Sequence, residues 1–348
     1  MLIKLEESVR TAEPERRVFL LGAGFSAYAK YPLVRDLRKA VLEDIENDKS
    51  GCYFWCERWR DEFWAGLKVA DSALSYGGMN PEDCFEEILL YLSRAKLDDS
   101  AAMTTDRILR CATGRLLWKL NKQSLPDEYR HFVNHAKCSI GVISFNWDVL
   151  LEAALWREGI LWEYKPINRP LPIIKPHGSI NWSGHEQLGN PGDPMWKELF
   201  SGSGLCWIPP RSTGDKSAEP DPAFQDPFPD CSNSDLNYML FPGDPDAPEA
   251  VVGTAISDKA VSDRRALWDH ACLLLEKSKE VVFLGYSLPA YDNYAVRRLK
   301  KSCRGKRVVV VNPCSNHAEE IKKNLEPDVD VTIKLERFEV SEYAKAIA

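Results

Sequence analysis

The sequence predicts an α/β fold: a doubly wound, mostly parallel, Rossmann-like sheet with an inserted helical module and a proline-rich loop insert. Short apolar runs at 17–22, 139–145, 280–286 and 307–312 alternate with helical patterns. A continuous apolar run of this length suits a strand that is buried on both faces of a parallel sheet. Strand–helix–strand units of such runs build open sheets with helices on both faces. The hydrophobic content of 44% is enough to form a large core.

Charge and apolar run lengths exclude several classes of protein. The chain has 45 Lys and Arg against 52 Asp and Glu, a net charge of -7, whereas a dedicated nucleic-acid binder is usually basic. The basic cluster between Arg297 and Arg307 is typical of a solvated helix face. The apolar stretches are shorter than a membrane span, and residues 1–17 lack the apolar region of a secretory signal. The 10 cysteines include no C-x-x-C pair, which argues against a zinc ribbon or knuckle. The lack of an export signal favours a reducing cytoplasm.

Residues 33–137 predict a helical module that follows the first strand and its glycine loop. Apolar residues recur in this stretch at helical spacing, and no strand pattern interrupts them. The stretch NPED at 80–83 is typical of a helix start, with an N-cap residue, a proline at the first position and acids in the first turn. Further helices are predicted over 102–121 and 126–137.

From residue 139 onward, strands and helices alternate again on both sides of a second insert. Helices are predicted over 147–158, 257–278 and 290–303, another ends near 325, and a short helix closes the chain. Eleven of the 22 prolines lie within 191–250, mixed with glycine, serine and aspartate. This composition predicts a surface-loop insert over 189–250 within a single domain that spans residues 1–348.

The loop GAGFSA at 22–27 fits the pattern G-x-G-x-x-A after a strand. Glycines allow backbone N–H groups to approach a pyrophosphate closely, and the N-terminus of a following helix favours negative charge. A tight strand-to-helix turn without a ligand is the alternative. A nicotinamide dehydrogenase also needs an acid at the end of a second strand about twenty residues on. That distance reaches Glu43 and Asp44, inside a helical pattern, so this enzyme class is not favoured.

Polar residues follow the other predicted strands as well. They are SFNWD at 144–148, HGS at 177–179, GYS at 285–287 and VN at 311–312. Ligands of open parallel sheets bind outside the carboxyl ends of the strands, so these clusters are expected to converge on one crevice. Each has a simpler alternative: Asn146 or Asp148 caps the following helix, and His177 is a hydrogen-bonded turn residue.

The ordered set of motifs resembles the sirtuin superfamily, and specifically its bacterial NAD-hydrolysing branch. The matching pieces are GAGFSAYAKYP (22–32), SFNWD (144–148), KPHGSINW (175–182), LGYSLPAYD (284–292) and VVNP (310–313). They cover most of the sheet, but neither the helical module nor the proline-rich insert. The resemblance implies NAD binding in a Rossmann-like site and cleavage of the bond between nicotinamide and ribose.

Residue roles follow from the same resemblance. The candidate catalytic residues are Asn146 and His177. The implied NAD-binding residues are Gly22, Ala23, Gly24, Phe25, Ser26, Asp148, Gly285, Ser287 and Asn312. In this assignment the glycine loop holds the diphosphate, Asp148 lies with Asn146 at the nicotinamide ribose and carboxamide, and the last three residues line the adenosine end.

Two departures from the family pattern indicate which member this chain resembles. A protein deacylase of the superfamily carries a four-cysteine zinc module, whereas only Cys206, Cys231 and Cys272 lie between His177 and Gly285. The glutamine that normally precedes the asparagine is Phe145 here. Both departures favour water over an acetyl-lysine oxygen as the acceptor of the ADP-ribosyl group. We therefore expect NAD to be the substrate of a hydrolysis reaction that uses no metal.

The resemblance further implies a self-associating, triggered antiphage effector, controlled by a partner protein in some cases. Three alternatives stay open: a non-catalytic sensor of NAD or ADP-ribose, a zinc-free deacylase, and a structural α/β scaffold that binds no adenine dinucleotide. His131 and His135, four apart on a predicted helix, are interpreted as a solvated pair, and the aromatic stretch 53–64 as core or interface.

Overall fold

The computed structural model describes residues 16–48, 57–82, 84–95, 100–121, 125–164, 171–183, 206–207, 238–240, 258–289, 292–326 and 329–346. Its main sheet has seven strands in the order β10-β9-β8-β1-β2-β4-β3, and every neighbouring pair is parallel. The strands are β1 (Arg17–Leu21), β2 (Gly141–Ser144), β3 (Trp162–Glu163), β4 (Leu171–Ile174), β8 (Glu280–Leu284), β9 (Arg307–Val311) and β10 (Asp330–Lys334). The predicted fold class is confirmed.

Strand β1 lies at the centre of the sheet because its sequence can be buried on both faces. Val18, Phe19, Leu20 and Leu21 are fully buried. Strand β1 pairs with β2 on one side and with β8 on the other, so that Leu21 lies opposite both Ser144 and Leu284. The carboxyl ends of three strands that are distant in the sequence therefore meet at one edge of the sheet.

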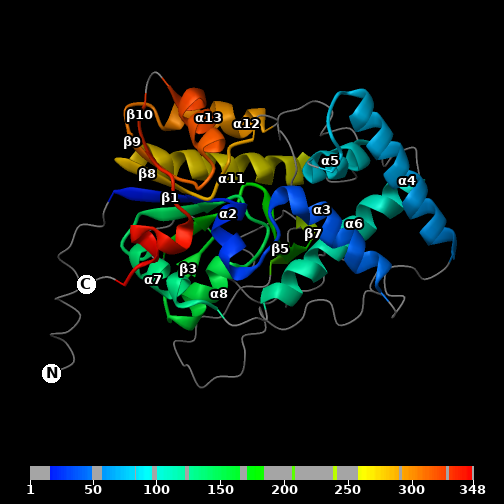
Figure 1. Cartoon of the computed structure of the whole chain (residues 1–348), viewed down its shortest axis with the longest axis horizontal. Helices are drawn as coiled ribbons and strands as arrows, with labels where there is room; N and C mark the ends of the chain where they lie inside the picture. The colour runs from blue at the N-terminus through cyan, green and yellow to red at the C-terminus, as the bar shows by residue number, and fades with distance from the viewer. Residues whose placement is uncertain are drawn as a thin grey trace.

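Helices cover both faces of this sheet (Figure 1). On one face lie α11 (Asp258–Lys277), α12 (Asn293–Ser302) and α13 (Ser315–Leu325). On the other lie α7 (Asp127–Ala136), α8 (Leu150–Arg157) and two short 3-10 turns, η3 (Phe338–Val340) and η4 (Glu342–Ala344). The rings of Phe19 on β1 and Phe132 on α7 make an edge contact with centroids 5.2 Å apart, which fixes the second layer to the sheet.

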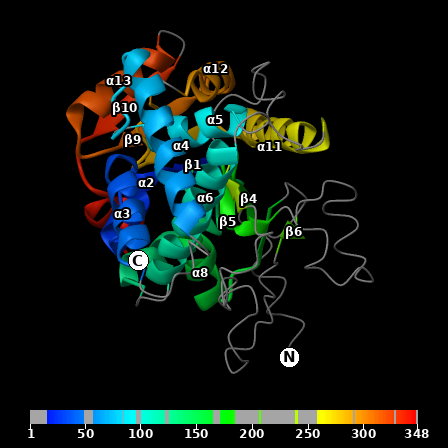
Figure 2. The ribbon, with the colours of Figure 1, turned by 90° about the vertical axis from the view of Figure 1, so that its right-hand side faces the viewer.

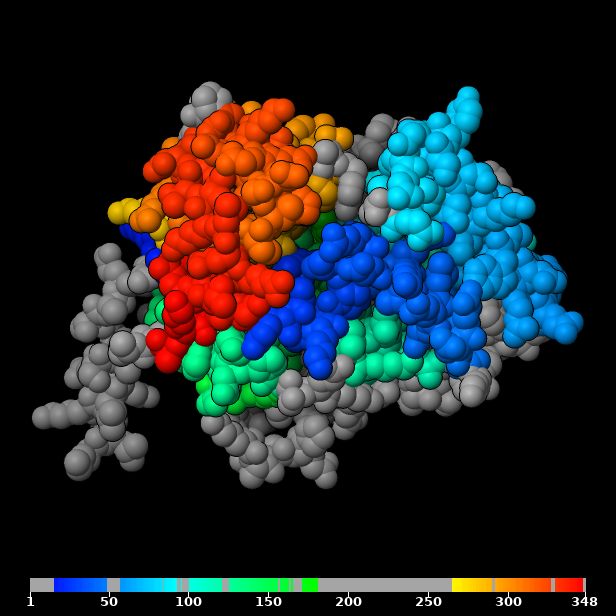
Figure 3. All heavy atoms as spheres, viewed as in Figure 1, coloured from blue at the N-terminus to red at the C-terminus, as the bar shows by residue number. Residues whose placement is uncertain are grey.

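Four helices between β1 and α7 project to one side of the sheet (Figures 1 and 2). They are α3 (Val34–Glu46), α4 (Glu57–Tyr76), α5 (Phe85–Ala95) and α6 (Ser100–Asn121). Helices α4 and α6 approach closely at Gly66, where a Cβ atom would lie 2.3 Å from Thr105 Oγ1. The α3 residue Arg38 binds Asp71 on α4 at 2.7 Å and also contacts Glu82. These four helices make up most of the helical module predicted over 33–137, whose remaining helix, α7, packs on the sheet instead. In the space-filling view, α3 lies on the face toward the viewer and α4 at one end of the molecule (Figure 3).

The boundaries of several elements differ from the predicted ones for local reasons. Helix α5 begins at Phe85, because residues 81–82 form a turn ahead of it. The predicted short final helix takes the form of two separate 3-10 turns, η3 and η4. Most of the 189–250 insert lies outside the described residues, but β6 (Cys206–Trp207) and β7 (Tyr238–Leu240) pair antiparallel with β5 (Gly178–Ser183) in a second sheet. Residues 53–56 of the aromatic stretch also lie outside the described part.

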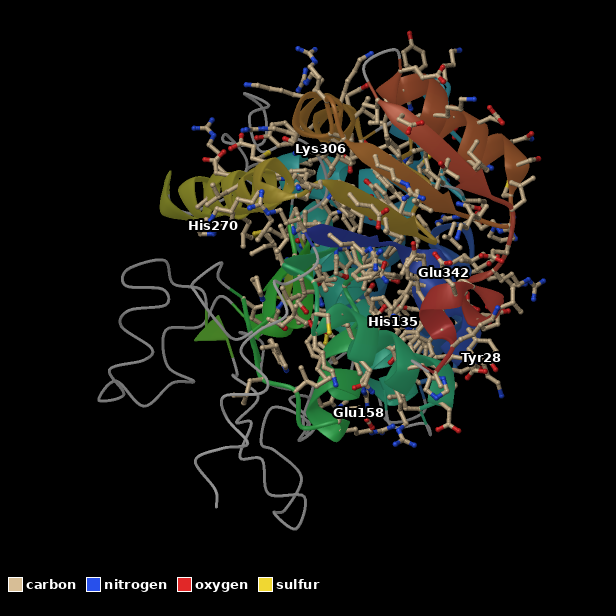
Figure 4. The ribbon with its side chains drawn as sticks, turned by 90° about the vertical axis from the view of Figure 1, so that its left-hand side faces the viewer. Tyr28, His135, Glu158, His270, Lys306 and Glu342 are labelled. Atoms are coloured by element: carbon tan, nitrogen blue, oxygen red, sulfur yellow. The ribbon has the colours of Figure 1, made fainter. Side chains whose placement is uncertain are left out.

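His131 and His135 are both partly exposed, as expected of a solvated pair, but each also contacts a carbonyl oxygen near the C-terminus. His131 Nδ1 lies 3.1 Å from the carbonyl oxygen of Ala344, and His135 Nε2 lies 3.2 Å from that of Lys345. Figure 4 shows His135 beside the segment that carries Glu342. The two imidazoles therefore attach the last described turn to α7, which sequence spacing alone did not indicate.

In the described ranges, every helix is either too short or too polar to cross a bilayer.

Candidate functional site

The glycine loop lies against the end of β8, and small residues are required on both sides of this contact. Gly22 donates its backbone N–H to Leu284 at 3.1 Å, and Gly24 donates to Gly285 at 2.9 Å. Gly285 has a φ of 63°, and a Cβ atom on it would lie 2.3 Å from the carbonyl carbon of Gly24. Side chains are thus excluded by the close approach of two backbones and by the left-handed conformation.

The helix after this loop is shorter than the motif suggests. Helix α2 (Ala23–Ser26) has 4 residues and leads into a 3-10 turn, Ala27–Ala29. A helix dipole builds up over several turns of aligned peptides, so the expected electrostatic help to a diphosphate is small here. The side chain of Phe25 turns into the core, where its ring lies 4.9 Å from that of Phe132.

Asn146 follows β2 and is bonded to the glycine loop. Its Nδ2 donates to the carbonyl oxygen of Gly22 and to Ser26 Oγ, both at 3.0 Å. Its own backbone N–H donates to Ser144 Oγ at 3.3 Å. Only 8% of the residue is exposed. The amide is therefore held at a fixed place between the ends of β1 and β2.

His177 lies in the turn between β4 and β5 and is held by the two neighbours of Asn146. Trp147 Nε1 donates to the carbonyl oxygen of His177 at 2.8 Å, and the Phe145 ring makes an edge contact with the imidazole at 5.0 Å. The backbone N–H of Ile180 donates to Trp147 at 2.9 Å. The structure thus brings the two candidate catalytic residues to the same edge of the sheet.

Two carboxylates that the sequence analysis did not select flank the His177 ring. Asp292 Oδ2 lies 3.0 Å from Nε2, and Glu86 Oε1 lies 4.0 Å from Nδ1. Burial raises the pKa of Glu86 to about 7, with His177 opposing this shift and Asp292 and Glu87 adding to it. Asp292 was hidden inside a predicted helix, although an acid just ahead of a helix start is a recognisable N-cap signal. Glu86 gave no signal in the sequence, because the helix was predicted to begin at 80–83, whereas it begins at Phe85 and Glu86 lies in its first turn.

Asp148 both caps α8 and belongs to a buried charge network. Its Oδ1 accepts the backbone N–H of Leu150 at 3.0 Å, so the simpler capping role is present in the structure. Burial raises the pKa of Asp148, and the nearby Lys175 opposes that shift. Lys175 Nζ donates to the carbonyl oxygen of Asp148 at 2.5 Å, to Ser179 Oγ at 2.7 Å and to Glu152 Oε1 at 3.1 Å. This buried lysine was not identified from the sequence.

The turn after β8 carries Tyr286 and Ser287 to the same edge. Tyr286 stacks on Phe145 with centroids 4.2 Å apart, and its carbonyl oxygen accepts Asn312 Nδ2 at 3.4 Å. Ser287 is half-buried. The next residue, Leu288, has a φ of 47° and a fully buried side chain. A non-glycine residue in this conformation is uncommon and is held there by its surroundings.

Most of the residues selected from the sequence lie at this one edge. Gly22, Gly24, Ser26, Asn146 and Gly285 are linked by the contacts described above. The Phe25 side chain is directed away from it into the aromatic core. Within the described ranges, no three His, Cys, Asp or Glu side chains gather in a group that could hold a metal ion.

Comparisons with known proteins give structural likeness only. No family model matches the sequence, and no curated protein does. A solved structure of a Sir2 enzyme is 14% identical, with a TM-score of 0.40, and the match covers 99% of this chain and 96% of that one. A Sir2 homologue in complex with NAD is 14% identical (TM-score 0.37; coverage 96% and 89%). Sir2 with a p53 peptide and NAD+ is also 14% identical (TM-score 0.37; coverage 97% and 94%).

Proposed function

We propose that this chain hydrolyses NAD at the nicotinamide–ribose bond to give ADP-ribose and nicotinamide. One observation carries the proposal: the Asn146 amide is bonded to the glycine loop at Gly22 and Ser26, while the residues on either side of it hold His177. An amide and an imidazole are thereby fixed next to a loop of the kind that binds dinucleotides. The resemblance of five ordered motifs to sirtuin-like NAD hydrolases agrees with this assignment.

The chemistry needs few groups, and Asn146 and His177 would supply them. Nicotinamide leaves as a neutral base from a cationic ring, so its departure requires no acid. Catalysis requires that the site stabilises an oxocarbenium-like ribose in the transition state and places a nucleophile beneath it. Asn146 would orient the water or a ribose hydroxyl without adding charge. His177 would accept the proton that the water loses as its oxygen bonds to the ribose carbon.

Phe145 supports water as the acceptor. It replaces the glutamine of the sirtuin pattern, and its ring is stacked on Tyr286 and in contact with His177. This aromatic surface offers no amide for an acyl group. A zinc-free deacylase is therefore the weaker candidate, and nicotinamide release that requires an acetylated peptide would favour it.

A second candidate is a non-catalytic sensor of NAD or ADP-ribose. The observation in its favour is that the site is closed: Asn146 and His177 are 8% and 5% exposed, and the asparagine amide already bonds to the loop. A sensor would bind NAD without releasing nicotinamide at any protein concentration.

The decisive experiment measures nicotinamide release from NAD by the purified full chain. Asn146→Ala and His177→Ala are each expected to abolish release, while Asn316→Ala and His317→Ala, exposed residues on α13, are matched controls that should retain it. Full turnover in either site variant would refute the assignment. Titration of NAD binding in the same samples separates hydrolysis from sensing.

We further propose that this activity is controlled in the cell. Hydrolysis of bulk NAD would poison the host, and the resemblance is to antiphage effectors that self-associate and respond to a trigger. The assay should therefore span a wide range of protein concentrations, and cellular NAD should be followed after phage infection. Loss of NAD in infected cells that carry the wild type, but not His177→Ala, is the expected result.

A further inference from the structure

The His177 imidazole is enclosed between carboxylates from two elements that are far apart in the sequence. Asp292, just ahead of α12, lies 3.0 Å from Nε2, and Glu86, on α5 of the helical module, lies 4.0 Å from Nδ1. The side chains of His177, Asp292 and Glu86 are 7%, 5% and 14% exposed. Charges enclosed to this degree are weakly screened, so each carboxylate acts strongly on the ring.

The two oxygens of Asp292 have separate tasks. Oδ1 accepts the backbone N–H of Ala295 at 3.0 Å and so caps α12, while Oδ2 faces His177 and lies 3.5 Å from the Tyr286 hydroxyl. The cap holds the carboxylate in one orientation. An ionised carboxylate can only accept hydrogen bonds, so Nε2 must carry a hydrogen. In the neutral ring, the lone pair is then on Nδ1.

Glu86 is the acid that faces this second nitrogen. Helix α5 is anchored by the fully buried side chains of Phe85, Ile88 and Leu89, and this anchoring fixes the position of Glu86. Burial raises the pKa of Glu86 to about 7. The other charged groups that act on Glu86 are His177, Asp292 and Glu87. Because His177 opposes the raised pKa of Glu86, the charge states of the two groups depend on each other.

We propose, on the basis of the function proposed above, that Asp292 and Glu86 are positioning residues for His177. Asp292 fixes the ring with its hydrogen on Nε2, and Glu86 retains the proton that Nδ1 must lose before the histidine can act as a base. The helical module thus contributes a proton-binding group to the site. Any movement of α5 would change the distance between the Glu86 carboxylate and the imidazole.

The two variants are expected to change different features of the pH profile of activity: Glu86→Gln its midpoint, and Asp292→Asn its plateau rate. In Glu86→Gln, a negative charge that favours the imidazolium is removed, so the rise of activity with pH should move to lower pH by about one to three pH units. Its plateau rate should be kept, because the ring is still oriented. In Asp292→Asn, the helix cap is retained, because the amide oxygen can accept from Ala295, but the ring loses the carboxylate that fixes its tautomer. The plateau rate should therefore fall, by at least tenfold.

The first measurement is the pH profile of nicotinamide release by the full-length wild type, Glu86→Gln and Asp292→Asn. Asp36→Asn is the control, because Asp36 is an exposed first-turn acid on α3. Its profile should coincide with that of the wild type. An unmoved profile in Glu86→Gln, or an unchanged plateau in Asp292→Asn, would overturn the proposal.

The second measurement does not depend on turnover. The chain has 6 histidines, so ¹⁵N labelling of histidine with His177→Ala as the assignment reference identifies the His177 ring nitrogens. The wild type should show the hydrogen on Nε2, Asp292→Asn a larger fraction on Nδ1, and Glu86→Gln a titration midpoint at lower pH. A wild-type ring protonated on Nδ1 alone would refute the role of Asp292. If no nicotinamide is released in any sample, the proposed function fails, while the ring titration still decides this proposal.

Discussion

The backbone N–H of Gly24 donates to the carbonyl oxygen of Gly285 at 2.9 Å, and this bond joins the glycine loop after β1 to the end of β8. The two backbones touch because neither residue has a side chain. Gly22 belongs to the same contact, since a Cβ atom on it would lie 2.5 Å from Tyr286 Cα. The loop is therefore shaped as much by its partner strand as by its own sequence.

Gly285→Ala is expected to displace the glycine loop. The new methyl group would lie 2.3 Å from Gly24 and Phe25 backbone atoms, in addition to the cost of about 1–2 kcal/mol for a left-handed alanine. Gly305→Ala is a matched control, because Gly305 has a similar φ of 71° with nothing within 4 Å of the added Cβ. Chemical denaturation and NAD titration should show a small loss of stability and intact binding for the control. For Gly285→Ala they should show a larger loss of stability and weaker binding, and equal effects would contradict the steric argument.

Lys175→Met is expected to lower the free energy of unfolding by about 3–5 kcal/mol, because it leaves Glu152 as an unpaired buried charge. The double variant Lys175→Met with Glu152→Gln removes that charge and should recover part of the loss. Urea unfolding of the single and double variants provides the comparison. Additive losses would mean that the two residues act independently. The single variant should also raise the pKa of Asp148 further, since Lys175 opposes its upward shift.

Glu86→Gln should change stability in a pH-dependent way. The pKa of Glu86 is raised from 4.5 to about 7 in the folded chain, so its protonated form is favoured by folding. This contribution is fully present below pH 4.5 and is lost as the pH rises to about 7. It amounts to about 3 kcal/mol at 1.36 kcal/mol per pKa unit. The melting temperature of Glu86→Gln relative to wild type should therefore rise between pH 5 and pH 8, and a flat difference would contradict the raised pKa.

Trp147→Phe is expected to loosen the turn that carries His177 while keeping an aromatic ring in the core. The variant lacks the Nε1–H that bonds to the His177 carbonyl at 2.8 Å and leaves that buried oxygen without this donor. The cost should be about 1–3 kcal/mol. Nicotinamide release should fall with the NAD Michaelis constant little changed, since the loss is in the orientation of the ring. Unaltered stability and turnover would show that the bond does not position His177.

The positions of the main strands and their parallel arrangement were accessible from the sequence, because buried parallel strands leave continuous apolar runs. The same logic placed Asn146 and His177 at strand ends, where they lie. Of the two carboxylates beside His177, Asp292 had an N-cap signal that was missed because the helix was predicted to begin near 290. Glu86 was not accessible, because it reaches the ring only through the packing of the helical module against the sheet. The bonds from His131 and His135 to the C-terminal turn also depend on a contact between residues more than two hundred positions apart. Spacing within one helix carries no information about such partners.

The backbone conformation of Leu288 has a consequence for the turn after β8. Its left-handed φ of 47° is unfavourable for leucine, yet its side chain is fully enclosed. A glycine would relax the backbone but would empty that volume, whereas alanine would empty it and still be strained. Packing of the Leu288 side chain therefore offsets the unfavourable backbone conformation and maintains the turn that positions Tyr286 and Ser287. If this packing were lost, both residues would be displaced together.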